Sequence, residues 1–586
     1  MRVFLDVPFG MRVAYYLYLN WANALGRCKP SRKPTLKFMI IYQIYPRSFN
    51  DSNHDGVGDL PGITAKLDYI QSLGVDMIWV GPFFKSPMRD FGYDVADYRD
   101  VDPMFGTLAD FRILLAQAKQ RGMGIMIDMV MSHTSDEHPW FKASRQKSEG
   151  RDDWYLWADP KRDGTPPNNW MSVFGGPAWQ WDAGRRQYFF HTFLSSQPDL
   201  NLHCPAVQDQ VLAEMEFWLK EGVAGFRLDA CIHLFQDLEL RDNPPIEDSS
   251  RALHPYGWQE HEFDKYRPEV LPFLERVRTL LDVYGAFSVG EVGGDNALPV
   301  MGQYTRSGRL HSAYSFDLIR SDRSEAHVRH VLTELQKHIT APGLACVALS
   351  NHDVARVATR WGEGREPQAH AKQMLALLAC MHGVICLYQG EELGLPQADV
   401  PFERLQDPFG KAFWPKYKGR DGCRTPLPWN SQAPWGGFST TEPWLPVDPH
   451  HLTLSVEQQE TQDDSTLAFA RAIFALRKAR PELREGELRF LTNMPRGVLA
   501  FSRMLTQGEE LRCLFNLSDK ARQVSFSADG RVVVSQHAEV RGDMLTLEPS
   551  GFCLYERVLT PTCTQQVDIT PLLDSANQQE RQEVFG

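Results

Sequence analysis

The sequence predicts an α/β fold: a (β/α)8 TIM barrel with a small domain inserted after the third strand and an antiparallel β domain at the C-terminal end. Three observations support this prediction. Eight short apolar runs recur along the chain, stretches with helical spacing separate most of them, and the pattern changes to alternating apolar and polar residues after about position 485. Buried parallel strands are continuously apolar, whereas a strand with one solvated face alternates.

The eight apolar runs are rich in β-branched residues, and polar or charged residues follow them. Because strands and helices alternate, they predict a parallel barrel formed by 39–131 and 197–485. The expected strands lie within 39–45, 77–80, 124–130, 225–229, 287–291, 313–317, 345–353 and 384–392. The expected helices are 61–73, 108–120, 206–220, 268–284, 324–338 and 368–381.

Two long intervals interrupt this pattern. About seventy residues rich in Trp, Pro, Gly and Asp separate the third run from a helix that begins near Pro205. A structureless loop of that length is improbable, so we expect 132–196 to form an inserted domain. A second excursion, 391–450, is rich in Pro and Trp and should fold over the carboxyl-terminal face of the barrel. Alternating segments then predict a small antiparallel β domain over 486–558.

The two ends of the chain differ from the rest. Residues 1–38 carry seven Lys or Arg and one Asp, and their apolar part is broken by Asn20 and Asn23, so no clean signal peptide emerges. A start site chosen too far upstream would also explain this segment. We expect 1–38 to be a poorly ordered extension without an assigned function, and 559–586 to be a polar, frayed tail.

Bulk properties restrict the partners. The net charge of −12 argues against a nucleic-acid partner, which would favour a basic face. No apolar run approaches the roughly 20 residues needed to cross a bilayer, so we expect no membrane association. The ten Cys form no CxxC pair, and several lie in apolar runs, which indicates buried free thiols in a reducing compartment. We therefore expect a cytoplasmic monomer or weak homo-oligomer; a periplasmic or secreted protein is the less favoured alternative.

Polar and charged residues gather where four of the runs end. In a barrel the carboxyl ends of all strands face one mouth, and burying so much charge there is costly without pairing and function. Because the fourth and fifth strands are neighbours, Asp229 and Glu291 can flank a bond, and glycoside hydrolysis needs two such carboxylates. A single Asp at a strand end could be a cap or a surface charge. The residues concerned are Asp128, His133, Arg227, Asp229, Glu291, His352 and Asp353.

Ordered motifs in these regions resemble those of the α-amylase family, glycoside hydrolase family thirteen. The resemblance covers about 39–558 and is closest to the α-glucosidase and oligo-1,6-glucosidase subfamily. QPDLN, GRDGCRTPLPW and YQGEELG are typical of that branch. The family motifs are IYQIYPRSF (41–49), DMVMSH (128–133), QPDLN (197–201), GFRLDA (225–230), GEV (290–292) and SNHD (350–353).

The resemblance implies a retaining α-glucoside hydrolase with three catalytic carboxyl groups. Asp229 would attack the anomeric carbon, Glu291 would act as general acid and base, and Asp353 would grip ring hydroxyls and stabilise the transition state. The carboxyl groups of Asp229 and Glu291 should then lie about 5–5.5 Å apart. Supporting roles fall to Arg227, which would hold Asp229 ionised, and to His133 and His352, which would hydrogen-bond the first sugar.

Three further family positions concern substrate size. Asp90 matches the carboxylate that binds the far hydroxyls of the terminal glucose, Tyr93 matches the ring that stacks on that sugar, and Arg420 matches the Arg partner of the carboxylate. An Asp90–Arg420 pair would close the pocket behind one glucose unit and so imply exo-action on short substrates. The alternative is an ordinary surface salt bridge.

Two positions depart from the family pattern. Ser132 stands where the family has Asn before the His of the first motif, which weakens one supporting hydrogen bond. Ala230 follows the proposed nucleophile. In this subfamily Val at that position goes with α-1,6 activity and Ala or Thr with α-1,4 cleavage, so Ala230 favours maltose-like α-1,4 substrates and leaves isomaltose-like substrates and sucrose open.

An oxygen-rich loop after the first strand indicates a metal site. Carboxylate and amide oxygens alternate in Asp51–Asp59 with Gly56 at the sixth position, as in an EF-hand loop, but the twelfth position is Gly62. Relatives in the subfamily bind one structural Ca²⁺ in such a loop, and the alternative is a solvated polar turn. No organic cofactor is expected. The implied ligands are Asp51, Asn53, Asp55, the Val57 carbonyl and Asp59.

Three functions remain open on this scaffold. The first is an exo-acting α-glucosidase that takes a small α-glucoside. The second is a transglycosylase or sucrose isomerase, which would share Asp229, Glu291 and Asp353 and differ in how well the intermediate is shielded from water. The third is a non-catalytic subunit of a transporter, which the presence of every carboxylate disfavours.

Overall fold

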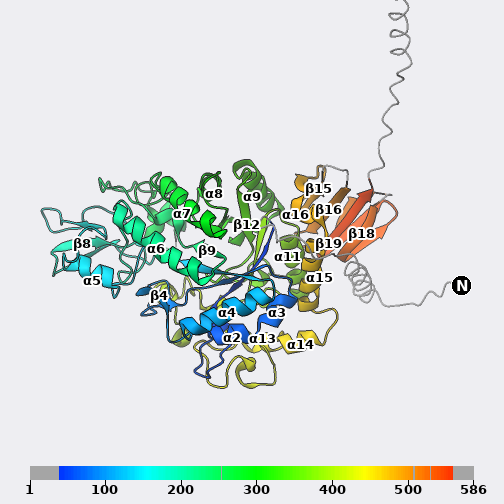
Figure 1. The fold of residues 1–586 in the computed structure, drawn as a ribbon. Coiled ribbons are helices and arrows are strands. Elements are labelled where there is room, and N and C mark those ends of the chain that lie inside the picture. Colours follow the sequence, from blue (N-terminus) through cyan, green and yellow to red (C-terminus); the bar gives the residue numbers. More distant parts are fainter. Residues whose placement is uncertain (1–37, 253, 506–508, 528–529, 559–586) are drawn as a thin grey trace, which may run out of the picture.

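The computed structural model describes residues 38–252, 254–505, 509–527 and 530–558 (Figure 1). The predicted extension 1–38, apart from Phe38, and the predicted tail 559–586 lie outside these residues. Within the described ranges, no helix is both long and apolar enough to span a membrane. The cysteines described are all free, and all except the half-buried Cys204 are buried.

A closed barrel of eight parallel strands forms the core, which confirms the predicted fold class. The order around the barrel is β1-β13-β12-β11-β10-β9-β5-β2, so each strand lies beside its neighbours along the barrel sequence and the last closes on the first. The strands are β1 Ile40–Ile44, β2 Met77–Val80, β5 Gly124–Met129, β9 Gly225–Leu228, β10 Phe287–Val292, β11 Ser312–Ser315, β12 Leu344–Ala348 and β13 Val384–Tyr388.

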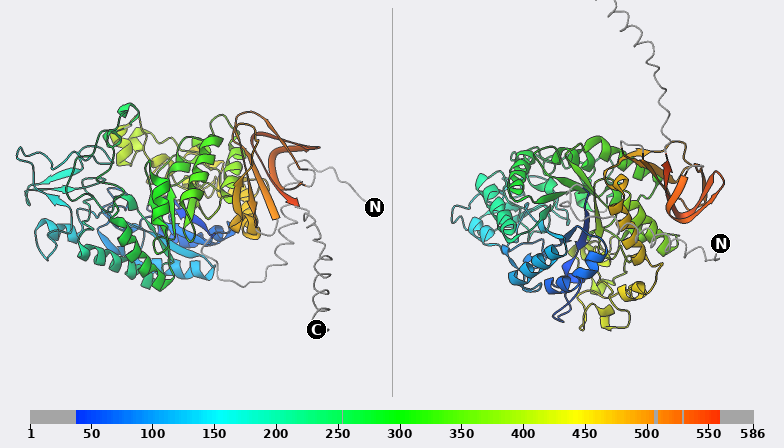
Figure 2. Two further views of the ribbon diagram at one scale, coloured as in Figure 1. Left: turned by 90° about the horizontal axis from the view of Figure 1, so that it is seen from above. Right: turned by 45° about the vertical axis from the view of Figure 1, so that its right-hand side comes forward.

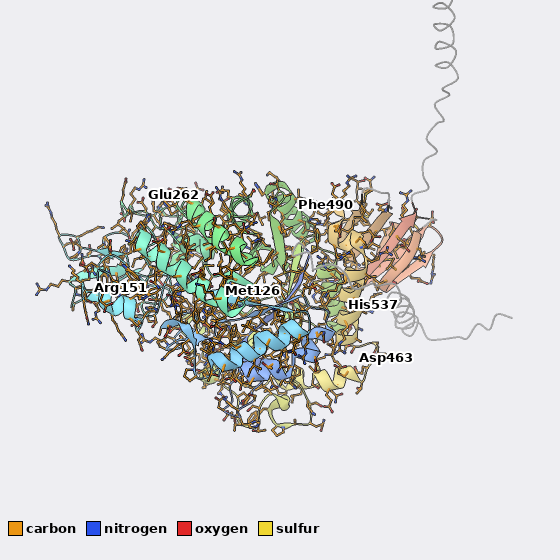
Figure 3. All side chains as sticks on the ribbon, in the orientation of Figure 1. Met126, Arg151, Glu262, Asp463, Phe490 and His537 are labelled. Atoms are coloured by element: carbon orange, nitrogen blue, oxygen red, sulfur yellow. The ribbon has the colours of Figure 1, made fainter. Side chains whose placement is uncertain are left out.

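The side chains of these strands alternate between two apolar environments, because successive Cβ atoms point to opposite faces of a strand. In β1, Ile41 belongs to the cluster inside the barrel, and Ile40 and Tyr42 pack towards the surrounding helices. Met126 of β5 lies in the inner cluster near the middle of the molecule, between Arg151 of the inserted segment and His537 of the C-terminal sheet (Figure 3). Burial on both faces explains why the strands read as continuous apolar runs.

Helices connect the strands, and they differ from the prediction in three places: one expected helix is broken, and Ala297–Tyr304 and Thr466–Ala479 were not predicted. The expected helix 61–73 is broken at Lys66, whose φ of −107° and ψ of 11° are not helical. The first half, LPGITA, contains Gly and two β-branched residues and is a weak helix former. The helix Ala297–Tyr304 was not predicted, because it is buried around most of its circumference and shows no amphipathic pattern. The barrel helices are α2 Leu60–Ala65, α3 Leu67–Ser72, α4 Leu108–Gln120, α6 Pro205–Glu221, α7 Val270–Tyr284, α8 Ala297–Tyr304, α9 Glu325–His338, α11 Pro367–Ala379 and α15 Thr466–Ala479.

Two excursions extend from the carboxyl ends of the strands. Between β5 and α6, where we expected an inserted domain, the helix α5 Pro139–Arg145 accompanies a small antiparallel sheet at one end of the molecule (Figure 1). Its strands are β6 Trp157–Ala158, β7 Trp179–Asp182 and β8 Gln187–Phe190. Nearer the barrel, β3 Phe84–Lys85 pairs with β4 Asp97–Val101. After β13, the chain forms the short helices α12 Pro408–Phe413, α13 Pro449–Leu452 and α14 Val456–Glu460.

The C-terminal antiparallel sheet lies at the opposite end of the molecule from the inserted segment (Figure 2). The buried Arg503 of β15 holds it to the barrel by donating to the carbonyl oxygen of Cys380 at 2.6 Å. Within the barrel, the buried Arg477 of α15 donates to the carbonyl oxygens of Ala379 and Met381 at 2.8 and 2.7 Å. The strands are β14 Glu487–Phe490, β15 Val498–Met504, β16 Glu509–Asn516, β17 Arg522–Ser525, β18 Gly530–Arg541 and β19 Met544–Val558.

Candidate active site

Strand register places the two central carboxyl groups at one level of the barrel. In the parallel pair β9–β10, Arg227 lies opposite Val289 and Leu228 lies opposite Gly290. Asp229 and Glu291 follow these partners directly, so they leave neighbouring strands at the same height. On the other side of β9, Asp128 of β5 lies opposite Arg227. The barrel therefore brings together three acidic side chains that are distant in the sequence.

Arg227 links these three acids. Its side chain is 1% exposed. Nη1 donates to Asp128 Oδ1 at 2.7 Å and to Asp229 Oδ1 at 2.6 Å, and Nη2 donates to Glu291 Oε2. Nη2 also lies 3.1 Å from the Tyr314 hydroxyl. One planar guanidinium group thus holds the proposed nucleophile and the proposed acid close to each other.

Burial shifts the titration of both central carboxyl groups. Burial raises the pKa of Asp229 to about 6, although Arg227 beside it acts in the opposite direction. Burial also raises the pKa of Glu291 to about 7, again against Arg227, and the negative charge of Asp229 adds to the increase. Because the two groups interact, their titrations belong to the pair. The arrangement favours an ionised Asp229 beside a protonated Glu291, the two states that glycoside hydrolysis uses.

Asp353 lies in a more positive environment. Its Oδ1 accepts a hydrogen bond from Arg424 Nη2 at 2.8 Å and a longer one from Arg420 Nη1 at 3.4 Å. Burial opposes its ionisation, but His352, Arg424 and Arg420 hold the pKa of Asp353 well below its ordinary value. Asp353 is therefore ionised over the whole range in which Asp229 and Glu291 titrate.

His352 is fixed from both ring nitrogens. Nδ1 lies 2.7 Å from Gln43 Nε2, and Nε2 lies 2.6 Å from the Tyr93 hydroxyl. The rings of His352 and Tyr93 stack at 5.6 Å with an angle of 10° between their planes. Burial lowers the pKa of His352 to about 3, so the imidazole is neutral at physiological pH. Tyr93, expected to stack on the sugar, stacks on His352 in this structure.

Asp90 and Arg420 form the pair that the sequence predicts. Arg420 Nη2 donates to Asp90 Oδ1 at 2.8 Å. The side chains are 6% and 11% exposed, which rules out an ordinary surface salt bridge. Gln197 Nε2 donates to Asp90 Oδ2 at 3.3 Å and lies 3.1 Å from His133 Nε2. Gln197 therefore connects the Asp90–Arg420 pair to the histidine of the first motif.

His133 has a hydrogen-bond partner at the preceding position, although this chain has Ser132 where the family has Asn. Ser132 Oγ lies 2.9 Å from His133 Nδ1. Burial lowers the pKa of His133 to about 4, so this imidazole is also neutral. Ser132 thus supplies a side-chain partner for the ring of His133.

Ala230 has an unusual backbone conformation. Its φ of 43° and ψ of 41° are left-handed, a region that residues other than glycine rarely adopt. Its N–H lies 3.3 Å from Glu291 Oε2. The turn after β9 therefore supplies a hydrogen bond to the proposed acid, and a β-branched side chain at position 230 would add strain beside that group.

Sequence reasoning missed six residues that complete this site. Most of them lie in motifs or runs already noted: Gln197 in QPDLN, Arg424 in GRDGCRTPLPW, and Tyr314 at the end of a barrel strand. Their roles depend on hydrogen bonds across the barrel mouth, which no sequence spacing reveals. The six are Gln43, Trp79, Gln197, Tyr314, Asp407 and Arg424.

The predicted calcium loop folds around Asp51, which is 5% exposed. Asp51 Oδ1 accepts from the Asn53 and His54 amides and Oδ2 from the Gly56 amide, at 2.7–3.1 Å. Asp59 caps helix α2 through the Gly62 amide at 2.6 Å. The oxygens are of the type that Ca²⁺ prefers, and Asn53 and Asp55 are exposed. Among the described residues, no three His, Cys, Asp or Glu side chains converge closely enough to hold a metal, so a cation here would need these side chains to reorient.

Known proteins resemble this chain over most of its length. Residues 43–486 match the family model described as the α-amylase catalytic domain. A protein named "Probable alpha-glucosidase" from Rhizobium meliloti (strain 1021) is 52% identical over 495 residues, which are 82% of this chain and 89% of that protein. An oligo-1,6-glucosidase from Parageobacillus thermoglucosidasius is 35% identical over 83% of this chain and 90% of its own. The solved structure of the α-glucosyl transfer enzyme XgtA has a TM-score of 0.86 and 49% identity, covering 90% of this chain and all of that one.

Proposed function

Because the chain belongs to the α-amylase family of glycoside hydrolases, we propose that it is a retaining, exo-acting α-glucosidase that releases terminal α-linked glucose from short, maltose-like substrates. One observation carries the proposal. Arg227 holds Asp229 and Glu291 on a single guanidinium group, and the buried Asp90–Arg420 pair would close the site behind one sugar. This geometry suits two-step displacement at the anomeric carbon of one terminal sugar.

In the first step, the Asp229 carboxylate attacks the anomeric carbon and the bond to the glycosidic oxygen breaks. Glu291 gives its proton to that oxygen, so the leaving sugar departs as a neutral alcohol and glucose remains bound to Asp229 as an ester. Arg227 orients Asp229, and the ionised Asp353 grips ring hydroxyls and stabilises the positive charge that develops on the ring.

In the second step, water replaces the leaving sugar. The ionised Glu291 takes a proton from the water as its oxygen attacks the anomeric carbon, and the bond to Asp229 breaks. This step restores the ionised Asp229 and the protonated Glu291. Two displacements at one carbon return the product to the starting configuration.

Two features support the proposed substrate size and the proposed linkage. A buried Asp90–Arg420 pair would close the site behind one glucose unit, which supports attack at the non-reducing end. Ala230, in the turn after β9, supports the α-1,4 linkage through the subfamily pattern. Because the chain is also similar to an oligo-1,6-glucosidase, α-1,6 cleavage is the competing specificity.

A second candidate function is glucosyl transfer on the same site. The similarity to the α-glucosyl transfer enzyme favours it, since that structure covers most of this chain at 49% identity. Transfer uses the same ester on Asp229 and replaces water by a sugar hydroxyl. We propose that hydrolysis dominates at low acceptor concentration and that transfer accompanies it.

A panel of maltose, isomaltose, sucrose and maltotriose tests these functions. We expect glucose from maltose and maltotriose, with maltotriose shortened from its non-reducing end. New disaccharides or trisaccharides, measured by chromatography, would establish transfer, and preferential cleavage of isomaltose would overturn the proposed linkage. No release of glucose from any of the four would overturn the proposed function.

Activity should depend on pH through the catalytic pair. Asp229 must be ionised, so kcat/KM should rise with pH through its pKa of about 6. Glu291 must be protonated, so kcat/KM should fall above its pKa of about 7. A bell-shaped profile with a narrow maximum between these values is the expected result. In Glu291→Gln the alkaline limb should disappear; if this limb persists, another group controls it.

We also propose that the Asp51–Asp59 loop binds one structural Ca²⁺. The alternating oxygens support this, and binding to the folded state alone would stabilise the protein. Chelation should lower Tm by a few degrees and leave kcat nearly unchanged, and Asp55→Ala should abolish the effect of chelation. Asp163→Ala is the control. Asp163 is exposed and lies outside the loop, and its carboxylate accepts from the amide two residues later, as that of Asp55 does. An unchanged Tm after chelation, with no metal detected by elemental analysis, would contradict the proposal.

We propose that the enzyme is cytoplasmic and that it is a monomer or a weak homo-oligomer. The buried free thiols in the described ranges support a reducing compartment. Size-exclusion chromatography with light scattering will measure the oligomeric state.

A further inference from the structure

Arg420 is surrounded by three carboxylates, of which two have been described. Besides Asp90 and Asp353, it contacts Asp407, in the loop that follows β13. Arg420 Nη2 and Nε donate to Asp407 Oδ1 at 2.8 and 3.1 Å. The Asp353 side chain is 23% exposed and the Asp407 side chain is fully buried. Asp407 therefore lies behind Arg420, where substrate does not reach it.

Asp407 also binds the backbone of the residue that it holds. Its Oδ2 accepts from the Arg420 amide at 2.8 Å, so the carboxylate grips both the guanidinium group and the main chain. The backbone N–H of Asp407 donates in turn to Asp421 Oδ2 at 2.9 Å. These bonds tie Asp407 to the segment that carries Arg420 and Asp421. Gly419 permits the close approach: its φ is +82°, and a Cβ there would lie 2.7 Å from Asp407 Oδ2.

Three carboxylates compete for hydrogen bonds from the guanidinium group of Arg420. Asp90 and Asp353 are both ligands expected for the glucose, and both draw on the same guanidinium group. The two bonds from Asp407 fix Nε and Nη2, which keeps Nη2 on Asp90 and leaves only the long 3.4 Å contact between Nη1 and Asp353. Without the charge of Asp407, Arg420 would move towards Asp353 and occupy a carboxylate that the sugar needs.

We propose that Asp407 is a positioning residue that holds Arg420 at the closed end of the pocket and so sets the affinity for the terminal glucose without touching it. This inference rests on the proposed α-glucosidase function. It concerns the ground-state fit of the far hydroxyls of the sugar, so its effect falls on KM more than on kcat.

The test compares Asp407→Asn with Asp448→Asn. Both residues cap a short helix that begins with Pro, at Pro408 and Pro449, but the Asp448 carboxylate bonds to His450 and not to Arg420. For maltose we expect Asp407→Asn to raise KM by about tenfold with kcat within about threefold, since a charged hydrogen bond is lost. Asp448→Asn should change neither.

A deoxygenated substrate separates positioning from a general loss of structure. Asp90 and Arg420 are expected to bind the far hydroxyls, so the penalty of Asp407→Asn should appear with an aryl α-glucoside and largely vanish with its 4-deoxy analogue. Equal losses of kcat/KM on the two substrates, or no loss on either, would overturn the role of Asp407. If the wild-type enzyme fails to hydrolyse the aryl α-glucoside, the proposed function itself is wrong.

Thermal unfolding gives a test that is independent of activity. Arg420→Ala would leave Asp407 buried without its partner and should lower Tm. Adding Asp407→Asn to that variant removes the unpaired charge and should recover part of the loss. A double variant less stable than Arg420→Ala would show that Asp407 does not act through Arg420.

Discussion

Replacing Asp229 with Ala should reduce kcat/KM for maltose by at least about 10⁴-fold, the scale found when a nucleophile is removed. The side chain that forms the ester is then absent, and a neutral water molecule in its place is a far weaker nucleophile than the carboxylate that Arg227 orients. Azide is small enough to enter the space left by the carboxylate. It should restore measurable turnover of an activated aryl α-glucoside and give a β-glucosyl azide.

A matched control for this variant is Asp237→Asn. Asp237 is also buried and follows the same strand, but its carboxylate pairs with Arg241, outside the site. It should keep near-normal activity, and both variants should give the wild-type circular dichroism spectrum. If Asp229→Ala retains more than a few per cent of wild-type activity on an aryl α-glucoside, another group is the nucleophile.

Replacing Glu291 with Gln should reduce kcat/KM for maltose by about 10³-fold, within the usual contribution of general acid catalysis. The loss should be much smaller for a nitrophenyl α-glucoside, because its leaving group needs little protonation. The ester would then accumulate, since no base activates water in the second step. Burst kinetics followed by a slow steady state would measure this imbalance directly.

In the related variant Glu291→Ala, azide should attack the ester from the face that water uses and give an α-glucosyl azide, opposite to the product expected for Asp229→Ala. Nuclear magnetic resonance distinguishes the two configurations. Glu275→Gln is the control, because Glu275 pairs with Arg309 on the outer surface. The same azide configuration from both site variants would contradict the assignment of nucleophile and acid.

Much of the fold could be predicted because one physical constraint governs it. A strand buried on both faces must be apolar along its length, and all eight barrel strands carry that pattern. The break at Lys66 and the helix Ala297–Tyr304 escaped prediction, since local propensity and burial around the helix, not periodicity, determine them.

The site could be predicted only where a polar or charged residue stands at the end of an apolar strand. Asp229 follows one apolar strand and Glu291 lies near the end of the next, and strand order made them neighbours. Asp407 does not follow an apolar strand. It lies in a long loop, and its role arises only because folding brings it into contact with Arg420. Gln197 likewise gains its role by reaching both Asp90 and His133.

The ring of charges around Arg227, Arg420 and Arg424 also bears on which sugars the pocket admits. Three guanidinium groups face six carboxyl groups, so the pocket stays negative even when Glu291 is protonated. A neutral hexose can exchange hydrogen bonds with these groups, whereas a phosphate ester or a uronic acid would bring a like charge into a poorly hydrated space. At neutral pH, glucose 6-phosphate should therefore inhibit far more weakly than glucose, and the negative pocket would keep phosphorylated sugars out of the reach of this enzyme.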